Sequence, residues 1–328
     1  MQINFSTIGI VIIGRNEGKR LIDCLDSLAE FMPQVVYVDS ASTDESVFEA
    51  QNRGGHVVSL DMTKAFTAAR ARNAGFDAIT SLFPDIKFVQ FLDGDCIVNA
   101  NWIPQAIDFL ISKPAVAVVC GRRREIYPQH SVYNNLCDQE WNTPLGEAKA
   151  CGGDALMRVD VLKLVGGYNN SLIAGEEPEL CIRIRQAGFL VWRLDAEMTL
   201  HDAAIKKLSQ WWKRTMRGGY AFAEGAFMHG DKPEYHWVTE TKRAWIWGAL
   251  LPIVILLAML INPLTGLILL LIYPLQILRL TFKSQHVFKD AFIQSTFITL
   301  GKFAEATGQI KFWMNRILKK QTKIIEYK

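Results

Sequence analysis

The 328-residue sequence lacks the marks of several protein classes. Charged residues make up only 21% of the chain and apolar residues 50%, which excludes an intrinsically disordered protein. Its six cysteines include no C-x-x-C pair, so neither a zinc ribbon nor a thioredoxin-like site is indicated. The sequence also lacks internal repeats and low-complexity segments. These absences leave a globular chain, long enough for about two folding units.

Basic charge is scarce until the end of the chain. From Arg279 onward there are ten Lys and Arg against three Asp and Glu, which leaves a net charge of −4 for residues 1–278, since the whole chain carries +3. A basic tail beside an apolar stretch is typical of proteins at an anionic membrane surface. Nucleic-acid binding would more often use a basic face of the folded body, so a nucleic-acid partner is not expected.

The first residues, MQINFSTIGIVIIG, lack the basic start and the long apolar run of a signal sequence. They are expected to form a β-strand. The cysteines, at positions 24, 96, 120, 137, 151 and 181, are expected to be mostly buried free thiols. Together these features predict that the N-terminal body lies in a reducing cytoplasm.

Short apolar runs alternate with helical patterns at the start of the chain. Strands are expected at residues 8–13, 35–38, 57–60 and 88–92, and helices at 19–31, 43–52 and 67–82. Continuous apolar strands need cover on both faces, which favours a mainly parallel sheet of a doubly wound α/β domain. Ligands bind at the carboxyl ends of such strands. Those ends are polar here, at residues 14–18, 39–44 and 93–95.

The following part of the body is less regular. A strand is expected at residues 116–120, a helix at 177–186 and a strand-like stretch at 191–194. Residues 203–227 place Trp and Ile among Lys and Arg, a pattern typical of a helix that lies along a bilayer surface.

Residues 244–278 contain no charged residue and carry Asn262-Pro263 near their middle. One membrane span needs about 20 apolar residues, so this stretch predicts a hairpin of two short spans. Its alternative is a buried hairpin in a soluble core. Basic residues flank the stretch on both sides, which predicts that both ends face the cytoplasm. Residues 291–300 are too short to span alone and are either an interfacial helix or part of a longer third span.

Carboxylates stand where the predicted strands end. Asp93-Gly94-Asp95 follows a strand directly, and oxygen ligands so spaced can hold Mg²⁺ or Mn²⁺ against a diphosphate, although many such triplets are ordinary turns. Asp39, at another strand end, could accept a hydrogen bond from a base or ribose. Its neighbour Asp44 is expected to cap a helix. Asn16 and Glu17 could either contact a nucleotide or cap the helix that follows them.

Six segments, taken in order, resemble the motif series of the family-2 inverting glycosyltransferases of the GT-A fold. They are VIIGRNEG, VDSASTDES, ARARNAG, FLDGDC, the Gly152-Gly153 segment with RVDVLKLVGGY, and GEEPELCIR. The resemblance covers about residues 8–200, and its specificity comes from the ordered set. It implies a nucleotide site formed by Arg15, Asn16, Glu17, Asp39, Arg72, Asn73 and Asp93.

The resemblance also implies the remaining site residues. Asp93 and Asp95 would hold the metal, with His201 either a third ligand or a structural histidine. The general base would be Glu177 by position, with Glu176 as its possible stand-in. Acceptor contacts are also expected from Gly152 and Gly153. The run Arg122-Arg123-Arg124 follows the strand expected to end at Cys120-Gly121, where Arg122 and Arg124 could bind an acceptor's phosphate, and Trp212 could stack on a sugar ring. Each arginine could instead belong to a solvated face, and the tryptophan could be partly buried core or a headgroup anchor.

The sequence therefore predicts a metal-dependent, hexosyltransferase-type enzyme at the cytoplasmic face of the cell inner membrane. It would move one sugar from a nucleotide diphosphate sugar, preferably a UDP-sugar, to a lipid-linked or cell-envelope glycan acceptor, using Mg²⁺ or Mn²⁺. The expected domains are a GT-A domain over residues 1–240, a transmembrane hairpin over 241–283 and a basic amphipathic region over 284–328.

Two alternatives stay open. Processive synthases of the family carry a Q-x-x-R-W motif, and residues 210–215, QWWKRT, lack the tryptophan after arginine, which argues against a polymerising synthase. A catalytically silent membrane scaffold could keep the same fold. The oligomeric state is open.

Overall fold

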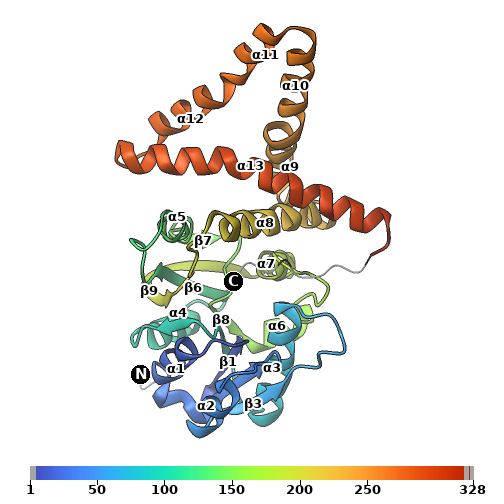
Figure 1. Cartoon of the computed structure of the whole chain (residues 1–328). Coiled ribbons are helices and arrows are strands. Elements are labelled where there is room, and N and C mark those ends of the chain that lie inside the picture. Colours follow the sequence, from blue (N-terminus) through green and yellow to red (C-terminus); the bar gives the residue numbers. More distant parts are fainter. Residues whose placement is uncertain (1–4, 321–324, 326–328) are drawn as a thin grey trace. The chain divides into compact units, whose positions relative to one another are not determined.

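A computed structural model describes residues 5–320 and 325 (Figure 1). The chain divides into two compact units, an N-terminal unit, Met1–Lys206, and a C-terminal unit, Lys207–Lys328. The predicted functional boundaries at residues 240 and 283 stay predictions. Part of the predicted basic tail, residues 321–324 and 326–328, lies outside the described residues.

The N-terminal unit is a mixed sheet with helices packed on it (Figure 1). Its strands are β1 (Ile8–Gly14), β2 (Val35–Asp39), β3 (His56–Ser59), β4 (Phe88–Asp93), β5 (Cys96–Val98), β6 (Val116–Glu125), β7 (Gly146–Ala148), β8 (Ala155–Arg158) and β9 (Leu190–His201). Its α-helices are α1 (Lys19–Asp26), α2 (Ser46–Asn52), α3 (Ala68–Leu82), α4 (Trp102–Ser112), α5 (Val132–Glu140), α6 (Val159–Val165) and α7 (Glu176–Gln186).

The sheet is parallel at one end and mixed at the other. Its order is β3-β2-β1-β4-β8-β6-β9-β5, with β7 paired to β9. The first four of these strands run parallel, as their continuous apolar runs predict, and α3 packs on β1 and β2. In the register, Gly14 lies opposite Asp39 and Ile13 opposite Asp93. Both predicted strand-end carboxylates are therefore at the same edge.

Strand β8 introduces the antiparallel part of the sheet. It lies between β4 and β6 and runs against both. The beginning of β8 consequently lies at the edge where β4 and β6 end. This places the Cys151–Asp154 segment, which directly precedes β8, beside the strand ends that carry Asp93 and the arginines of β6.

Three predicted elements differ in length. The expected helix over 19–31 ends at Asp26 and continues as a 3-10 helix, Ala29–Gln34, because Pro33 cannot donate an α-helical bond and the Ser27 hydroxyl donates to the Cys24 carbonyl at 2.6 Å. The strand expected at 116–120 continues to Glu125 through its pairing with β9, and β9 itself continues to His201.

The C-terminal unit is helical. Its helices are α8 (Leu208–His229), α9 (Val238–Trp245), α10 (Leu251–Ile261), α11 (Pro263–Leu270), α12 (Ile272–Lys283) and α13 (Phe288–Ile317), with one π-helical turn, Ile246–Leu250, between α9 and α10. Two continuous stretches, Val238–Ile261 and Pro263–Lys283, are long and apolar enough to cross a membrane. In Figure 1 they are two arms that meet near α11, at the turn that the Asn262 side chain caps.

Helices α8 and α13 pack together at very short range. A β-carbon on Gly308 of α13 would lie 2.0 Å from the Met216 carbonyl of α8. The Tyr220 and Phe312 rings meet edge-to-face beside this crossing. Helix α8, which contains most of the predicted amphipathic basic stretch, packs on α13 and therefore belongs to the C-terminal unit. Residues 291–300 belong to the 30-residue helix α13, and this helix is not one of the two candidate spans.

Candidate active site

The first two strand ends hold each other through short polar contacts. The Asp39 carboxylate accepts hydrogen bonds from the Ser42 backbone N–H at 3.1 and 3.2 Å. The Asn16 N–H donates to the Ser42 hydroxyl at 2.9 Å, and the Asn16 side-chain oxygen accepts from the Thr43 N–H at 2.7 Å. Asn16 is in the left-handed region, with φ 55°. These contacts fix a buried carboxylate, Asp39, at the rim of the sheet.

The neighbouring predicted residues differ in burial. Arg15 is exposed, whereas the Glu17 side chain is mostly buried and forms an ion pair with Arg20 at 2.7 Å. Asp44 accepts from the backbone N–H of Ser46 and of Gly18, so this carboxylate joins the first and second loops as a structural group.

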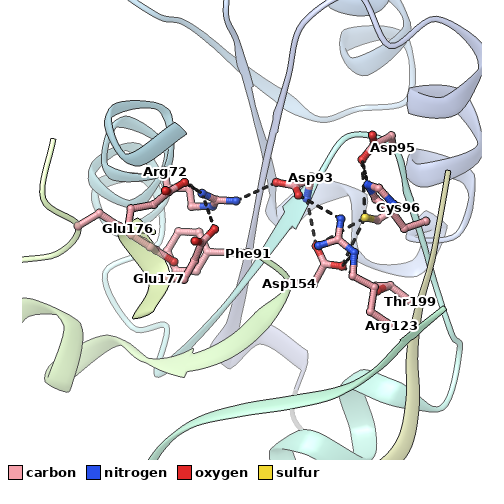
Figure 2. A network of polar contacts seen from close by, with 12 residues as sticks. Arg72, Phe91, Asp93, Asp95, Cys96, Arg123, Asp154, Glu176, Glu177 and Thr199 are labelled. Atoms are coloured by element: carbon pink, nitrogen blue, oxygen red, sulfur yellow. Dashed lines mark hydrogen bonds and ion pairs between the residues drawn. The ribbon is translucent and has the colours of Figure 1, made fainter. Parts of the chain in front are cut away.

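Arg72 of α3 is the hub of the site. Its side chain is 3% exposed, and its Nη1 lies 2.8 Å from Glu176 Oε1 and 3.0 Å from Glu177 Oε1. Its Nη2 lies 2.8 Å from Asp93 Oδ1 (Figure 2). One buried guanidinium thus joins the carboxylates of the strand-end loop to the acidic pair at the start of α7, which is more than 80 residues away in the sequence.

Asp93 lies between two arginines. Its Oδ2 accepts from Arg123 Nη2 at 3.3 Å, opposite the Arg72 contact (Figure 2). Burial works against ionisation of this carboxyl, yet Arg72 and Arg123 together keep the pKa of Asp93 below its ordinary value. Asp93 is therefore an anion over the whole physiological pH range.

Glu177 has the opposite electrostatic environment. Burial, assisted by the charge of Glu176, raises the pKa of Glu177 to about 7, although Arg72 opposes the shift. A carboxyl with this pKa is a good proton acceptor near neutral pH. The two glutamates are adjacent in sequence and are the first two residues of helix α7.

Asp95 and His201 come together from β-strand ends. His201 Nε2 lies 3.2 Å from Asp95 Oδ1, and both side chains are less than a tenth exposed. The His201 ring meets the Trp141 ring edge-to-face, with centroids 4.8 Å apart. The structure therefore brings together the two residues that the resemblance assigns to a metal.

Two members of this network were not among the predicted site residues: Asp154, and Arg123, which was named only as the middle of the arginine run. Asp154 is buried, accepts from the Thr199 hydroxyl at 2.7 Å, and lies 3.6 Å from Arg123 Nε (Figure 2). The Arg123 guanidinium also covers the Trp141 ring at 5.0 Å. Asp154 stands immediately before a strand, as Asp93 stands at the end of one, and this position is the signal that could have identified it.

Of the three successive arginines, only Arg123 enters the network. Arg122 pairs with Asp138 at 2.9 Å, and Arg124 pairs with Glu197 at 2.6 Å. The run was expected to follow a strand that ends near Gly121, but it lies within β6, whose register with β9 shifts on both sides of Arg122. Each of the three arginines consequently has different partners.

Gly153 lies too close to the ion pair for a residue with a side chain to fit without displacing it. A β-carbon there would lie 2.6 Å from Arg72 Nη2 and 3.0 Å from Asp93 Oδ2, whereas one on Gly152 would meet no atom within 4 Å. The backbone at Gly153 therefore closes over the Arg72–Asp93 ion pair, and Gly152 faces open space.

Two further predicted residues lie apart from the acidic network. The Asn73 side chain exchanges hydrogen bonds with the backbone of Tyr168, accepting at 2.9 Å and donating at 2.8 Å, so it holds the turn before α7. Trp212 lies on α8 in the C-terminal unit, beside Trp211. For these two, the nucleotide and acceptor roles stay predictions.

The donor set fits a divalent cation. Asp95 and His201 offer an oxygen and an imidazole nitrogen that, with the Cys96 sulfur, all lie within 4.8 Å of one another. These residues also hold more acid than base: Asp93, Asp154, Glu176 and Glu177 contact Arg72 or Arg123, and Asp95 contacts His201, which gives five carboxyl groups to two guanidinium groups. A cation would offset this excess, above all beside a diphosphate.

Comparison with known proteins gives a family match for part of the chain. The profile of glycosyl transferase family 2 matches residues 9–162. The chain is 24% identical over 199 residues to succinoglycan biosynthesis protein ExoA of Rhizobium meliloti, covering 57% of this chain and 59% of the relative. It is 24% identical over 195 residues to glycosyltransferase AglE of Haloferax volcanii, covering 56% and 62%. The chain thus spans less than two thirds of either relative.

The fold has a close counterpart among solved structures. A mannosyltransferase, PcManGT from Pyrobaculum calidifontis, in complex with GDP-Man and Mn²⁺, superposes with a TM-score of 0.63 at 18% identity, covering 93% of this chain and 87% of its own. This likeness is one of fold. Together with the profile match and the curated relatives, it identifies residues 9–162 as a glycosyltransferase family 2 domain of the GT-A fold.

Proposed function

We propose that the protein is a membrane-anchored, metal-dependent, inverting glycosyltransferase that moves a single sugar from a nucleotide diphosphate sugar to a lipid-linked or cell-envelope acceptor. The observation that carries this proposal is the Arg72 hub. Its buried guanidinium contacts both Glu177, whose pKa is raised to about 7, and Asp93, whose pKa is lowered and which lies beside the proposed metal ligands. Sugar transfer needs both a base and a charged donor site.

The N-terminal unit would bind the donor at the strand ends. Asp39 would accept a hydrogen bond from the base or ribose, because its carboxylate lies at the rim in register with Gly14. A UDP-sugar is the expected donor. Asp95 and His201, with Asp93 beside them, would hold Mg²⁺ or Mn²⁺, which when bound neutralises charge on the leaving diphosphate. An imidazole ligand favours Mn²⁺ over Mg²⁺, since Mg²⁺ prefers oxygen donors.

The chemical step would depend on Glu177. Its carboxylate would take the proton of the acceptor hydroxyl as that oxygen attacks the anomeric carbon, a contribution of about 10²- to 10⁴-fold. Arg72 would keep Glu177 and Glu176 oriented, since its Nη1 contacts both. One displacement inverts the anomeric centre and requires no enzyme nucleophile.

The C-terminal unit would hold the enzyme at the cytoplasmic face of the inner membrane. In an 18-residue window of each apolar stretch, Val238–Ile261 and Pro263–Lys283, only 11% is buried, so the exposed apolar surface of these windows needs an apolar environment. Lys242 and Arg243 precede the hairpin core and Arg279 and Lys283 follow it, whereas its turn is uncharged. By the positive-inside rule both ends face the cytoplasm, where nucleotide sugars are available.

Calorimetry on the full-length protein in detergent tests the donor and metal assignments. We expect UDP to bind more tightly with Mn²⁺ than without it, and Asp95→Ala to remove the Mn²⁺-dependent part of the affinity. Asp85→Ala, at an exposed position before β4, is the matched control and should bind as the wild type does. Equal Mn²⁺-dependent affinity in wild type and Asp95→Ala would overturn the metal assignment.

The donor class is tested by thermal shift in the presence of Mn²⁺. Uridine and guanosine diphosphate sugars should be compared, and we expect UDP-sugars to raise the melting temperature most. If neither series stabilises the protein, the nucleotide-sugar proposal fails and a silent scaffold is favoured. Product length with a labelled donor separates single transfer from polymerisation.

A further inference from the structure

Two buried thiols of the N-terminal unit lie in contact. Cys151 Sγ lies 3.6 Å from Cys181 Sγ, close enough for one thiol to donate a hydrogen bond to the other. Cys151 stands in the segment between β7 and β8, and Cys181 stands in helix α7, 30 residues further along the chain. All six cysteines of the chain are free and buried. The fold thus brings together two reactive groups that the proposed function does not use.

The thiol pair lies next to the candidate base. Cys181 follows Glu177 by four residues in α7, so the two side chains lie on the same face of this helix. The hydrogen bond with Cys181, burial and the negative charge of Glu177 all raise the pKa of the Cys151 thiol well above its ordinary value. Cys151 is therefore a protonated and slowly reacting thiol at neutral pH.

The two segments that carry the thiols differ in their freedom to move. In a disulfide the sulfur atoms are about 2.05 Å apart, so this pair would have to approach by about 1.5 Å. Cys181 is held in the interior of an 11-residue helix. Cys151 precedes the exposed Gly152, where an added β-carbon would meet no atom within 4 Å. The Cys151 segment is thus the part that would move, and Gly153, whose backbone closes over the ion pair of the Arg72 hub, would move with it.

We propose that Cys151 and Cys181 form a reversible disulfide bond when the protein meets hydrogen peroxide, and that this bond weakens donor binding by displacing Gly153. The disulfide itself is independent of the proposed function. Its effect on the donor rests on the proposed function, because it requires the donor to bind beside Asp93. In a reducing cytoplasm the thiols stay free, and the disulfide forms only while peroxide is in excess.

The oxidation begins at Cys151, because this residue is 8% exposed whereas Cys181 is fully buried. The Cys151 sulfur attacks one peroxide oxygen, the O–O bond breaks, and a water molecule leaves with the thiol proton, which gives a sulfenic acid. The Cys181 sulfur then attacks the Cys151 sulfur, the S–O bond breaks, and a second water leaves with the second thiol proton. The two thiols lose two electrons in all, and these reduce one peroxide molecule to two waters.

Thiol counting and peptide mapping test the disulfide without a variant. Full-length protein in detergent is reduced, freed of reductant, treated with hydrogen peroxide and then denatured for thiol titration. We expect two of the six thiols of the sequence to disappear and to return with dithiothreitol. Mass spectrometry of the digested wild type should show the Cys151 and Cys181 peptides joined. A full count of thiols after treatment, or a disulfide at other cysteines, would overturn the proposal.

Matched variants separate this pair from the other buried thiols. Cys151→Ser and Cys181→Ser each remove one partner, so peroxide should form no intramolecular disulfide in either variant. Cys120→Ser is the control, because Cys120 is also buried and its Sγ contacts the Trp192 carbonyl at 3.7 Å. This variant should lose two thiols to peroxide, as the wild type does. A disulfide that requires Cys120 would contradict the assignment.

Calorimetry with UDP and Mn²⁺ tests the effect on the donor site. We expect the oxidised wild type to bind UDP at least about fivefold more weakly than the reduced protein, the lower end of typical coupling between two sites. Peroxide should leave the affinity of Cys151→Ser unchanged. Equal affinity of the reduced wild type and the wild type with a mapped disulfide would refute the coupling. Failure of the proposed function has a different signature, because UDP then does not bind to the reduced wild type either.

Discussion

The two units expose apolar side chains in different ways. In the N-terminal unit, exposed large apolar residues are scattered, such as Phe48 on α2 at 57% and Leu164 on α6 at 68%. In the C-terminal unit they follow one another along both arms of the hairpin, and reach 83% at Leu260 and 87% at Ile261. Scattered exposure is normal in water, whereas a continuous apolar surface is not. This contrast between the two units supports the proposed placement of the hairpin in lipid.

Charge follows the opposite pattern. The N-terminal unit buries charged side chains such as Arg72, Asp95 and Glu176, and Arg72 contacts three carboxylates. The hairpin core has none over residues 244–278. Burying a charge is costly unless it is paired, so a cluster of this kind persists where function requires it. This difference between the two units can be tested in two ways, by removing a buried charge from the N-terminal unit or by placing a charge in the hairpin.

The largest effect is expected from Glu177→Gln. The amide keeps the shape of the side chain but cannot take a proton, so transfer should fall by about 10²- to 10⁴-fold while donor binding is kept. Single-turnover transfer and UDP calorimetry measure the two effects. Glu147→Gln, an exposed acid on β7, should behave as wild type. Near-normal turnover in Glu177→Gln would move the base to Glu176.

The pH profile sharpens this prediction. A general base must be deprotonated to act, and the pKa of Glu177 is raised to about 7. The rate should therefore rise with pH through about 7 and level off above it. A profile that stays flat from pH 5 to 9, limits chosen as about two units to either side of that pKa, would contradict the assignment of Glu177.

Arg72→Ala should cost about 3–5 kcal/mol of unfolding free energy, because the buried Glu176 and the partly buried Glu177 and Asp93 lose their common partner. Arg72→Lys keeps the charge but cannot bridge in two directions, so it should recover only part of this loss. Arg124→Ala is the control, since the Arg124–Glu197 pair is about half exposed and should be worth no more than about 1 kcal/mol. Denaturant unfolding in detergent measures all three, and equal losses for Arg72→Ala and Arg124→Ala would refute the hub.

Ile253→Arg places a charge in the middle of the first apolar stretch. In a membrane this substitution should cost about 2.5–3.5 kcal/mol and lower the fraction of protein that resists alkaline extraction from membranes. Leu164→Arg, at a comparably exposed apolar position in the N-terminal unit, should have no effect on that fraction. If the two variants behave alike, the hairpin does not lie in lipid.

The smallest effect is expected at the glycine pair. Gly153→Ala should cost about 1–3 kcal/mol, because its methyl group would press on Arg72 and Asp93. Gly152→Ala meets no atom within 4 Å and should be neutral. Melting temperature and UDP affinity of the two variants decide the matter, and indistinguishable variants would show that Gly153 does not closely pack against the ion pair.

The strand ends could be predicted because the signals there are local. Continuous apolar runs predicted β1 to β4, and in a parallel arrangement their carboxyl ends share one edge, so Asp39 and Asp93 were placed together correctly. The family resemblance is confirmed by the profile match. The roles of the individual site residues stay predictions.

The remaining features depend on contacts between distant segments. No local pattern shows that β8 enters between β4 and β6, and this pairing alone brings Asp154 to the site. The pairing of β6 with β9 extends β6 to Glu125 and thereby selects Arg123 over its two neighbours. The close crossing of α8 and α13 joins helices from both sides of the hairpin, which a pattern of periodicity within either helix cannot reveal.

The reversed direction of β8 has one more consequence. Since β8 runs against β6, the intervening residues 126–154 leave the active edge of the sheet and return to it. The ion pair between Arg123 and Asp154 joins the two ends of this segment. The residues between these two ends can therefore differ in sequence or length without moving Arg123 and Asp154 apart.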